Sequence, residues 1–201
     1  GKSTYDAITN RWMQDTYNLL LGPFAKLKLN TEFSWIDYES YFAANTNSAF
    51  TFQPVGPLGT MEQLTLLGET ISYDFSEKMS CSADYKQYSY DIAGSANYYG
   101  AGLRYSLPKS TAAGVSVHRM DGEADRMNYD EYRVYIFKKI GHSNLTVDLL
   151  DVKYKEPVNN VSNAYSATLA AGYELSERLM LGADVEYAKN PDFDQDIRLF
   201  A

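Results

Sequence analysis

Apolar and polar residues alternate along most of this chain, and this two-residue period constrains its fold more than any other feature. Between Ala25 and Trp35 the odd positions are mainly apolar, and the even positions hold lysine, asparagine, glutamate and serine. Successive side chains of a β-strand point to opposite faces, whereas a helix repeats every 3.6 residues. The pattern therefore predicts strands with one apolar face and one wet face.

The same alternation recurs further along the chain, and several of the stretches run for roughly eight to eleven residues, as transmembrane strands do. The recurring segments are 99–106, 113–118, 132–137, 144–149, 166–173 and 181–187. Tyr135 and Phe137 are exceptions, because they fall on the polar face. The segments 63–74 and 79–90 fit less cleanly, since Glu69 falls on the apolar face.

One short phrase occurs twice, as "YDFSEKMSCSAD" at Tyr73–Asp84 and as "YELSERLMLGAD" at Tyr173–Asp184. Each copy lies between two alternating segments and carries Ser-Glu followed by a basic residue. We interpret the phrase as a tight hairpin turn that the chain uses twice, so the chain is predicted to be a serial array of hairpins.

Short and long connections also alternate. Short ones lie at "FSEK", "LPKS", "KKIGHS" and "LSER", and longer polar ones are predicted at about 38–62, 91–97, 121–130, 155–163 and 189–196. Short turns at one end and longer loops at the other are typical of an outer-membrane barrel.

Composition excludes several classes of protein. No run approaches the roughly 18 apolar residues of a transmembrane helix, and the mean hydropathy is -0.39. The net charge of -8 argues against nucleic acid as a partner, whereas 18 tyrosines and 9 phenylalanines fit a barrel. The single Cys81 can form no internal disulfide, and neither a CxxCH haem-attachment motif nor a Cys/His zinc cluster is present. The start at Gly1, without a charged and apolar leader, is expected of a mature or trimmed product.

The chain resembles a bacterial outer-membrane β-barrel, and its closing run "LSERLMLGADVEYAKNPDFDQDIRLFA" carries most of the likeness. We expect one all-β domain over residues 1–201: a transmembrane antiparallel up-and-down β-barrel with about ten strands in this chain, either a small barrel or part of a larger one. Residues 1–16 are expected to be less regular. An eleventh strand is expected to begin at Ile197 and to be truncated, because members of the family end in a complete last strand with a terminal aromatic residue.

The acidic, tyrosine-rich manner of the sequence most resembles the barrel subunits of porin-cytochrome electron conduits. The resemblance implies a place in the bacterial outer membrane, contact with its lipid and lipopolysaccharide, and a multihaem c-type cytochrome as partner. It implies a porin-like channel, or an insulating sheath around the cytochrome for electron transfer. No cofactor is expected in this chain itself, because haem would come only through the partner.

The alternation assigns candidate residues to each face. We predict a lumen lining of mixed charge that passes water and small polar solutes, and no catalytic, cofactor-binding or metal-binding residue. The predicted lumen-lining residues are Lys26, Lys28, Asp84, Lys86, Arg104, His118, Arg133, Asp148, Asp184 and Glu186. The predicted lipid-facing residues are Leu27, Leu29, Leu103, Val115, Val117, Leu169, Leu181 and Val185. Each lining charge has an alternative interpretation as a salt-bridge partner that fills the lumen.

Other classes of protein stay open at this point. A soluble antiparallel sandwich also alternates, but its strands are shorter, about five or six residues. A structural or adhesin-type barrel would use the Asn-, Thr-, Pro- and Gly-rich stretch 38–62. A rim-active outer-membrane protease would need His118 beside Asp121, Glu123 and Asp125, or the aspartates of 192–196, where solvated loop charge is the ordinary interpretation. Acidic loops also suit divalent ions that bridge lipopolysaccharide, but "NPDFDQD" lacks the Gly and the final Glu of an EF-hand loop.

Overall fold

Over the residues that the structure describes, twelve antiparallel strands form one sheet in which the spatial order equals the sequence order. The computed structural model describes residues 1–6, 11–37, 63–107, 110–176, 179–191 and 193–200. The strands are β1 (Lys2–Asp6), β2 (Arg11–Phe24), β3 (Leu27–Asp37), β4 (Gln63–Asp74), β5 (Met79–Tyr90), β6 (Gly94–Leu107), β7 (Thr111–Gly122), β8 (Tyr129–Ile140), β9 (Ser143–Val158), β10 (Val161–Ser176), β11 (Leu179–Asn190) and β12 (Phe193–Phe200). The predicted all-β, up-and-down antiparallel arrangement is thus confirmed.

The number of strands and one strand boundary were predicted wrongly, and both errors lie near the ends of the chain. Residues 1–16, expected to be less regular, contain β1 and the first part of β2. The last strand begins at Phe193 instead of Ile197. These segments alternate poorly, and β2 includes an unbroken Leu19-Leu20-Leu21 run. These segments are extended because they pair with a neighbouring strand, and alternation within the segment does not reveal that pairing.

The predicted long connection over 155–163 is also wrong. β9 continues to Val158 and β10 begins at Val161, so Asn159 and Asn160 alone form the turn. Their φ angles are 50° and 65°, the left-handed values that a two-residue hairpin turn of type I′ requires. Asparagine tolerates this conformation better than most residues. The stretch 38–62 lies outside the described residues.

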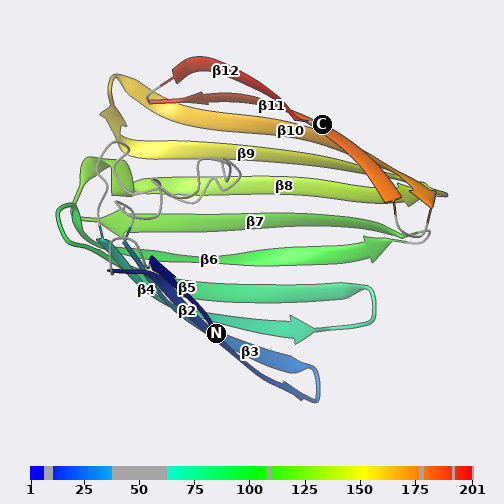
Figure 1. Ribbon diagram of the computed structural model, residues 1–201, viewed down its shortest axis with the longest axis horizontal. Helices are drawn as coiled ribbons and strands as arrows, with labels where there is room; N and C mark the ends of the chain where they lie inside the picture. The colour runs from blue at the N-terminus through cyan, green and yellow to red at the C-terminus, as the bar shows by residue number, and fades with distance from the viewer. Residues whose placement is uncertain (7–10, 38–62, 108–109, 177–178, 192, 201) are drawn as a thin grey trace.

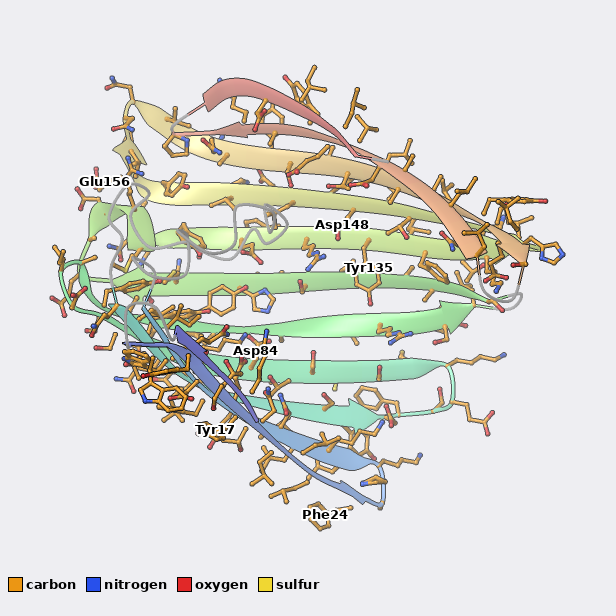
Figure 2. All side chains as sticks on the ribbon, viewed as in Figure 1. Tyr17, Phe24, Asp84, Tyr135, Asp148 and Glu156 are labelled. Carbon is orange, nitrogen blue, oxygen red and sulfur yellow. The ribbon has the colours of Figure 1, made fainter. Side chains whose placement is uncertain are left out.

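The sheet is curved into an open trough (Figure 1). We call the end with the 25–26, 75–78 and 141–142 connections the turn end, and the opposite end the loop end. β1 and β12 are the two edges of the sheet, and within the described ranges no backbone pairing joins them. In Figure 2 the side chains of Asp84, Tyr135 and Asp148 lie on the hollow side, which we call the concave face.

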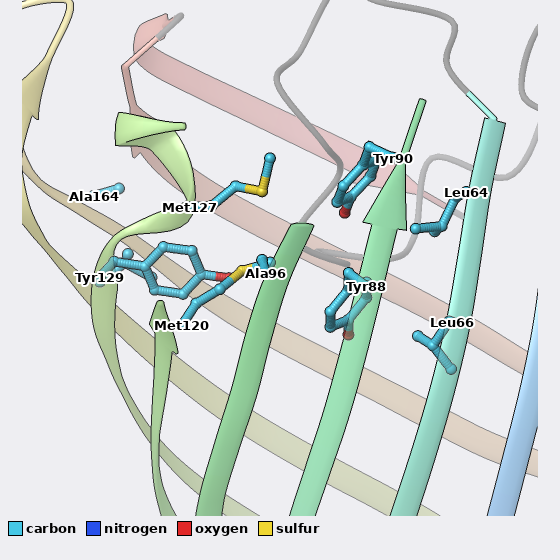
Figure 3. Close-up of a cluster of buried hydrophobic side chains, with 10 residues drawn as sticks. Leu64, Leu66, Tyr88, Tyr90, Ala96, Met120, Met127, Tyr129 and Ala164 are labelled. Atoms are coloured by element: carbon cyan, nitrogen blue, oxygen red, sulfur yellow. The ribbon is translucent and has the colours of Figure 1, made fainter. Parts of the chain in front are cut away.

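A buried apolar cluster lies on the concave face near the loop end (Figure 3). It consists of Leu64, Leu66, Tyr88, Tyr90, Ala96, Met120, Met127, Tyr129, Val152 and Ala164. Met127 comes from η1 (Asp125–Met127), a single 3-10 turn between β7 and β8. The Asn128 amide fixes this turn by donating to the carbonyl oxygens of Gly122 and Ala124, at 2.8 and 3.0 Å. In the part of the chain that the structure describes, no helix has the length and apolar character needed to cross a membrane.

Candidate functional site

The convex face carries uninterrupted rows of uncharged side chains. In one row Leu103 of β6 pairs with Val115 of β7, which pairs with Val134 of β8. These three side chains are 50%, 49% and 45% exposed. From β3 to β11 the row is Leu27, Tyr73, Cys81, Leu103, Val115, Val134, Leu149, Ala167 and Tyr187. Register therefore joins short apolar stretches from nine strands into one belt.

The eight residues predicted to face lipid all lie on this convex face. Six of them are exposed, namely Leu27, Leu103, Val115, Val117, Leu169 and Leu181. Leu29 and Val185 are partly buried beside their neighbours. Glu69, the violation noted in the sequence, is exposed on the same face. Its partner Tyr85 is part of a more polar row nearer the loop end, so the charge lies toward the margin of the apolar belt.

Tyrosines border the apolar belt on both sides. Along β10, Tyr165 and Tyr173 bracket Leu169, and along β6, Tyr99 and Tyr105 bracket Leu103. All four tyrosine side chains are exposed on the convex face. Tyrosine prefers the boundary between an apolar phase and water, because its ring is apolar and its hydroxyl is polar.

The tyrosines on the loop side of the belt direct their hydroxyls to polar partners. The Tyr99 hydroxyl donates to Asp121 at 2.6 Å, and the Tyr85 hydroxyl donates to Asn97 at 2.7 Å. Lys155 also bonds to Asp121. The aromatic rings thus border the belt while their polar ends engage groups nearer the loop end.

Charges appear on the convex face only beyond this border along β7, and the sequence analysis did not single them out. Arg119 donates twice to Asp130, at 2.7 and 3.1 Å. The available signal was the same alternation continued by one step, since Arg119 follows Val117 on the same face. The position of the first charge marks where the apolar belt ends on a given strand.

One predicted lumen-lining residue, Lys26, does not lie in a strand. Lys26, predicted within a strand that starts at Ala25, lies in the two-residue turn between Phe24 and Leu27, which pair directly. Ala25 has a φ of 58°, and the Lys26 ammonium donates to the Phe75 carbonyl oxygen at 3.0 Å. The strand begins later because the chain must reverse here, and alternation alone does not mark that point. Lys28 lies within β3 and donates to Asp74 at 2.9 Å.

His118 forms the centre of a polar cluster on the concave face. Its Nε2 lies 3.1 Å from an Asp84 oxygen, and its Nδ1 lies 3.5 Å from Glu131 without a well-aligned hydrogen bond. The Tyr98 hydroxyl donates to Glu131 at 3.0 Å. The Tyr98 ring also stacks on the imidazole, with ring centroids 4.8 Å apart. Asp84 and His118 were predicted lining residues, whereas Glu131 and Tyr98 were missed.

Two glycines provide the space for large concave side chains. A Cβ at Gly100 would lie 2.2 Å from the His118 ring, and a Cβ at Gly114 would lie 2.4 Å from the Tyr135 ring. Each glycine is the direct cross-strand partner of the ring that covers it. The rings therefore lie flat along the sheet instead of projecting into the trough. This accounts for the ring of Tyr135 on the concave face, where its cross-strand partner on β9 is Asp148.

The remaining predicted lining charges are partly paired. Arg133 donates to both carboxylate oxygens of Asp148, with its Nε at 2.9 and 3.0 Å. Lys86 lies 3.7 Å from Glu32. The other three predicted residues, Arg104, Asp184 and Glu186, also lie on concave positions of their strands. The concave face thus carries charges of both signs, and several of these charges neutralise one another.

The structure separates the residues of the protease alternative. His118 and Asp121 are three positions apart in β7, so their side chains lie on opposite faces. Glu123 is held by Ser95, whose backbone N–H and hydroxyl donate to it at 3.1 and 2.8 Å and lower the pKa of its carboxyl. Asp192 lies outside the described residues. Across the described ranges, no three His, Cys, Asp or Glu residues cluster as metal ligands would.

Comparison with known proteins adds no relative. No family model matches the chain, and no curated protein or solved structure matches it.

Proposed function

We propose that this chain forms the wall of a transmembrane β-barrel in a bacterial outer membrane, where it serves as a porin-like channel or as the insulating sheath of a multihaem cytochrome. The observation that carries the proposal is the uncharged convex belt, in which Leu103, Val115 and Val134 are about half exposed in direct register. Monomeric soluble proteins seldom expose so continuous an apolar surface.

No other part of the described chain covers this belt. The strands form a single sheet, so no second layer covers the convex face within the described residues. Apolar surface removed from water contributes roughly 25 cal/mol per Å². Hydrocarbon would cover the belt, and tyrosines at its two borders match the aromatic girdles of membrane barrels. The strand lengths support the same proposal, since β6 has 14 residues and β10 has 16.

The side chains of the concave face are consistent with a lumen that has room for solutes or for a partner protein. Small residues such as Ser82, Gly102 and Ser116 form a row across the middle of it, and the rings of His118 and Tyr135 lie over glycines. A barrel of this lining would admit water and polar solutes, or would surround a partner protein. The haem of a conduit would belong to that partner.

The decisive experiment is to extract the native complex from outer membranes in mild detergent and to record its mass and visible spectrum. A haem Soret band that co-migrates with the chain supports the sheath. A colourless barrel that conducts ions in a planar bilayer supports the channel. Recovery of the chain from the water-soluble fraction, with none in the membranes, would contradict both forms of the proposal.

A further inference from the structure

A groove of about 720 Å³ lies at the turn end, where the β4–β5 connection meets β6. Its polar lining includes Lys26, Asp74, Glu77, Lys78, Ser80, Arg104 and Ser106. Its volume is within the range of small-molecule sites, about 300–1,000 Å³. The backbone of the groove is fixed, because the Ser106 N–H donates to the Lys78 carbonyl oxygen at 2.6 Å.

The groove is lined by more positive than negative side chains. Asp74 is already neutralised by Lys28, whose ammonium lies 2.9 Å from it. Lys26, Lys78 and Arg104 then face a single further carboxylate, that of Glu77. Among the described residues, the side chains of Lys78 and Arg104 have no hydrogen-bond or ion-pair partner. The groove therefore holds donors that are not used by the fold.

The hydrogen-bond donors of the groove differ in shape, and together they suit a ligand with several oxygens. A guanidinium offers a planar pair of N–H groups that match two oxygens of a carboxylate or phosphate, and an ammonium adds a compact charge. The hydroxyls of Ser80 and Ser106 line the same groove and can donate to further oxygens. Such a combination suits an oxyanion with several oxygens.

We propose that this groove binds a small oxyanion, a phosphate or carboxylate group, through Arg104, Lys78 and Lys26. The inference goes beyond the proposed function and does not rest on it, because the groove is formed by β4, β5, β6, the β4–β5 connection and the β2–β3 turn whether or not the sheet spans a membrane. If the chain does form a pore, the groove lies at its turn-end mouth. There it would concentrate anions, either free solutes or lipid headgroup phosphates.

The test is a titration of inorganic phosphate into the detergent-purified protein, followed by calorimetry. The probe variant is R104Q/K78Q, and the matched control is K155Q, which removes a cation at the loop end. We expect saturable binding to the unaltered protein and to the control, and roughly tenfold weaker binding to the double variant, since charge-assisted hydrogen bonds are lost. Circular dichroism establishes that each variant retains its sheet.

Two results would overturn the inference: no saturable phosphate binding, or equal affinity in the double variant. A second arm repeats the titration in micelles that contain anionic phosphatidylglycerol. Weaker phosphate binding there assigns the site to a lipid headgroup, and unchanged binding assigns it to free anions. Because the assay needs no conductance, its failure would leave the membrane proposal untouched, and the reverse also holds.

Discussion

The two faces of β7 differ in polarity, although the residues that form them alternate along a single strand. Val115 and Val117 meet their surroundings as uncharged side chains about half exposed, whereas Ser116 and His118 lie on the concave face among polar partners. The convex belt contains no charge, whereas the concave face carries charges of both signs, several of which are paired, as in Arg133 with Asp148. The difference shows that one strand can present an apolar face and a polar face at once when its side chains alternate.

The largest expected effect tests the convex side of that comparison. Arginine at Val115 should lower the free energy of unfolding in lipid by about 2 to 4 kcal/mol if the position lies near mid-bilayer. Arginine at the adjacent Ser116 is the matched control and should cost much less, because it would point toward the polar face. Denaturant titration in lipid vesicles measures both. Equal costs at the two positions would break the assignment of the faces.

A second test concerns the space beside Gly100 that the His118 ring occupies. A valine at Gly100 would place side-chain atoms where the imidazole now lies, since even a Cβ would come within 2.2 Å of it. We expect a loss of about 1 to 3 kcal/mol, the usual range for overpacking. The control is Ala101→Val, whose side chain points to the open convex face. Denaturant titration of both variants is the measurement, and a tolerated Gly100→Val would show that the ring does not need this space.

A smaller effect is expected from the lining pair Arg133 and Asp148. The side chain of Arg133 is 52% exposed, so water and salt screen the pair in the trough. Arg133→Gln should therefore cost about 0 to 1 kcal/mol, near the range for solvent-exposed ion pairs. The double variant with Asp148→Asn completes a cycle that isolates the coupling between the two residues. A coupling energy well above this range would indicate that water reaches this pair less than its exposure implies.

The smallest effect concerns Glu123, outside the strands. Its hydrogen bonds from Ser95 hold the pKa of the carboxyl below its ordinary value of 4.5. A depressed pKa stabilises the fold above the ordinary value, and that contribution disappears as the pH falls below 4.5. Thermal unfolding between pH 7 and pH 3 should show a slightly steeper acid loss for the unaltered protein than for Glu123→Gln. Identical slopes would contradict the role of these hydrogen bonds.

The sequence predicted the face of a residue well wherever alternation was long and regular. Leu103 with Arg104, and Leu169 with Thr168, lie on opposite faces as their spacing requires. The presence of a strand was predicted less well where the segment is extended mainly because it pairs with a neighbouring strand. Residues 1–16 lacked a clear period, yet β1 pairs with β2 from Lys2 to Asp6. The Asn159 turn was mistaken for a loop because polar residues mark either a long loop or the end of a strand.

The amino-acid sequence by itself determined the period, and with it the antiparallel strands and the two unlike faces, because side-chain alternation is a local property of extended backbone. The tertiary structure alone decided which residues meet across strands. Asp84 and His118 lie 34 positions apart, and Glu131 lies on yet another strand. Their encounter depends on the register of several hairpins, and a shift by one residue would turn each side chain to the other face.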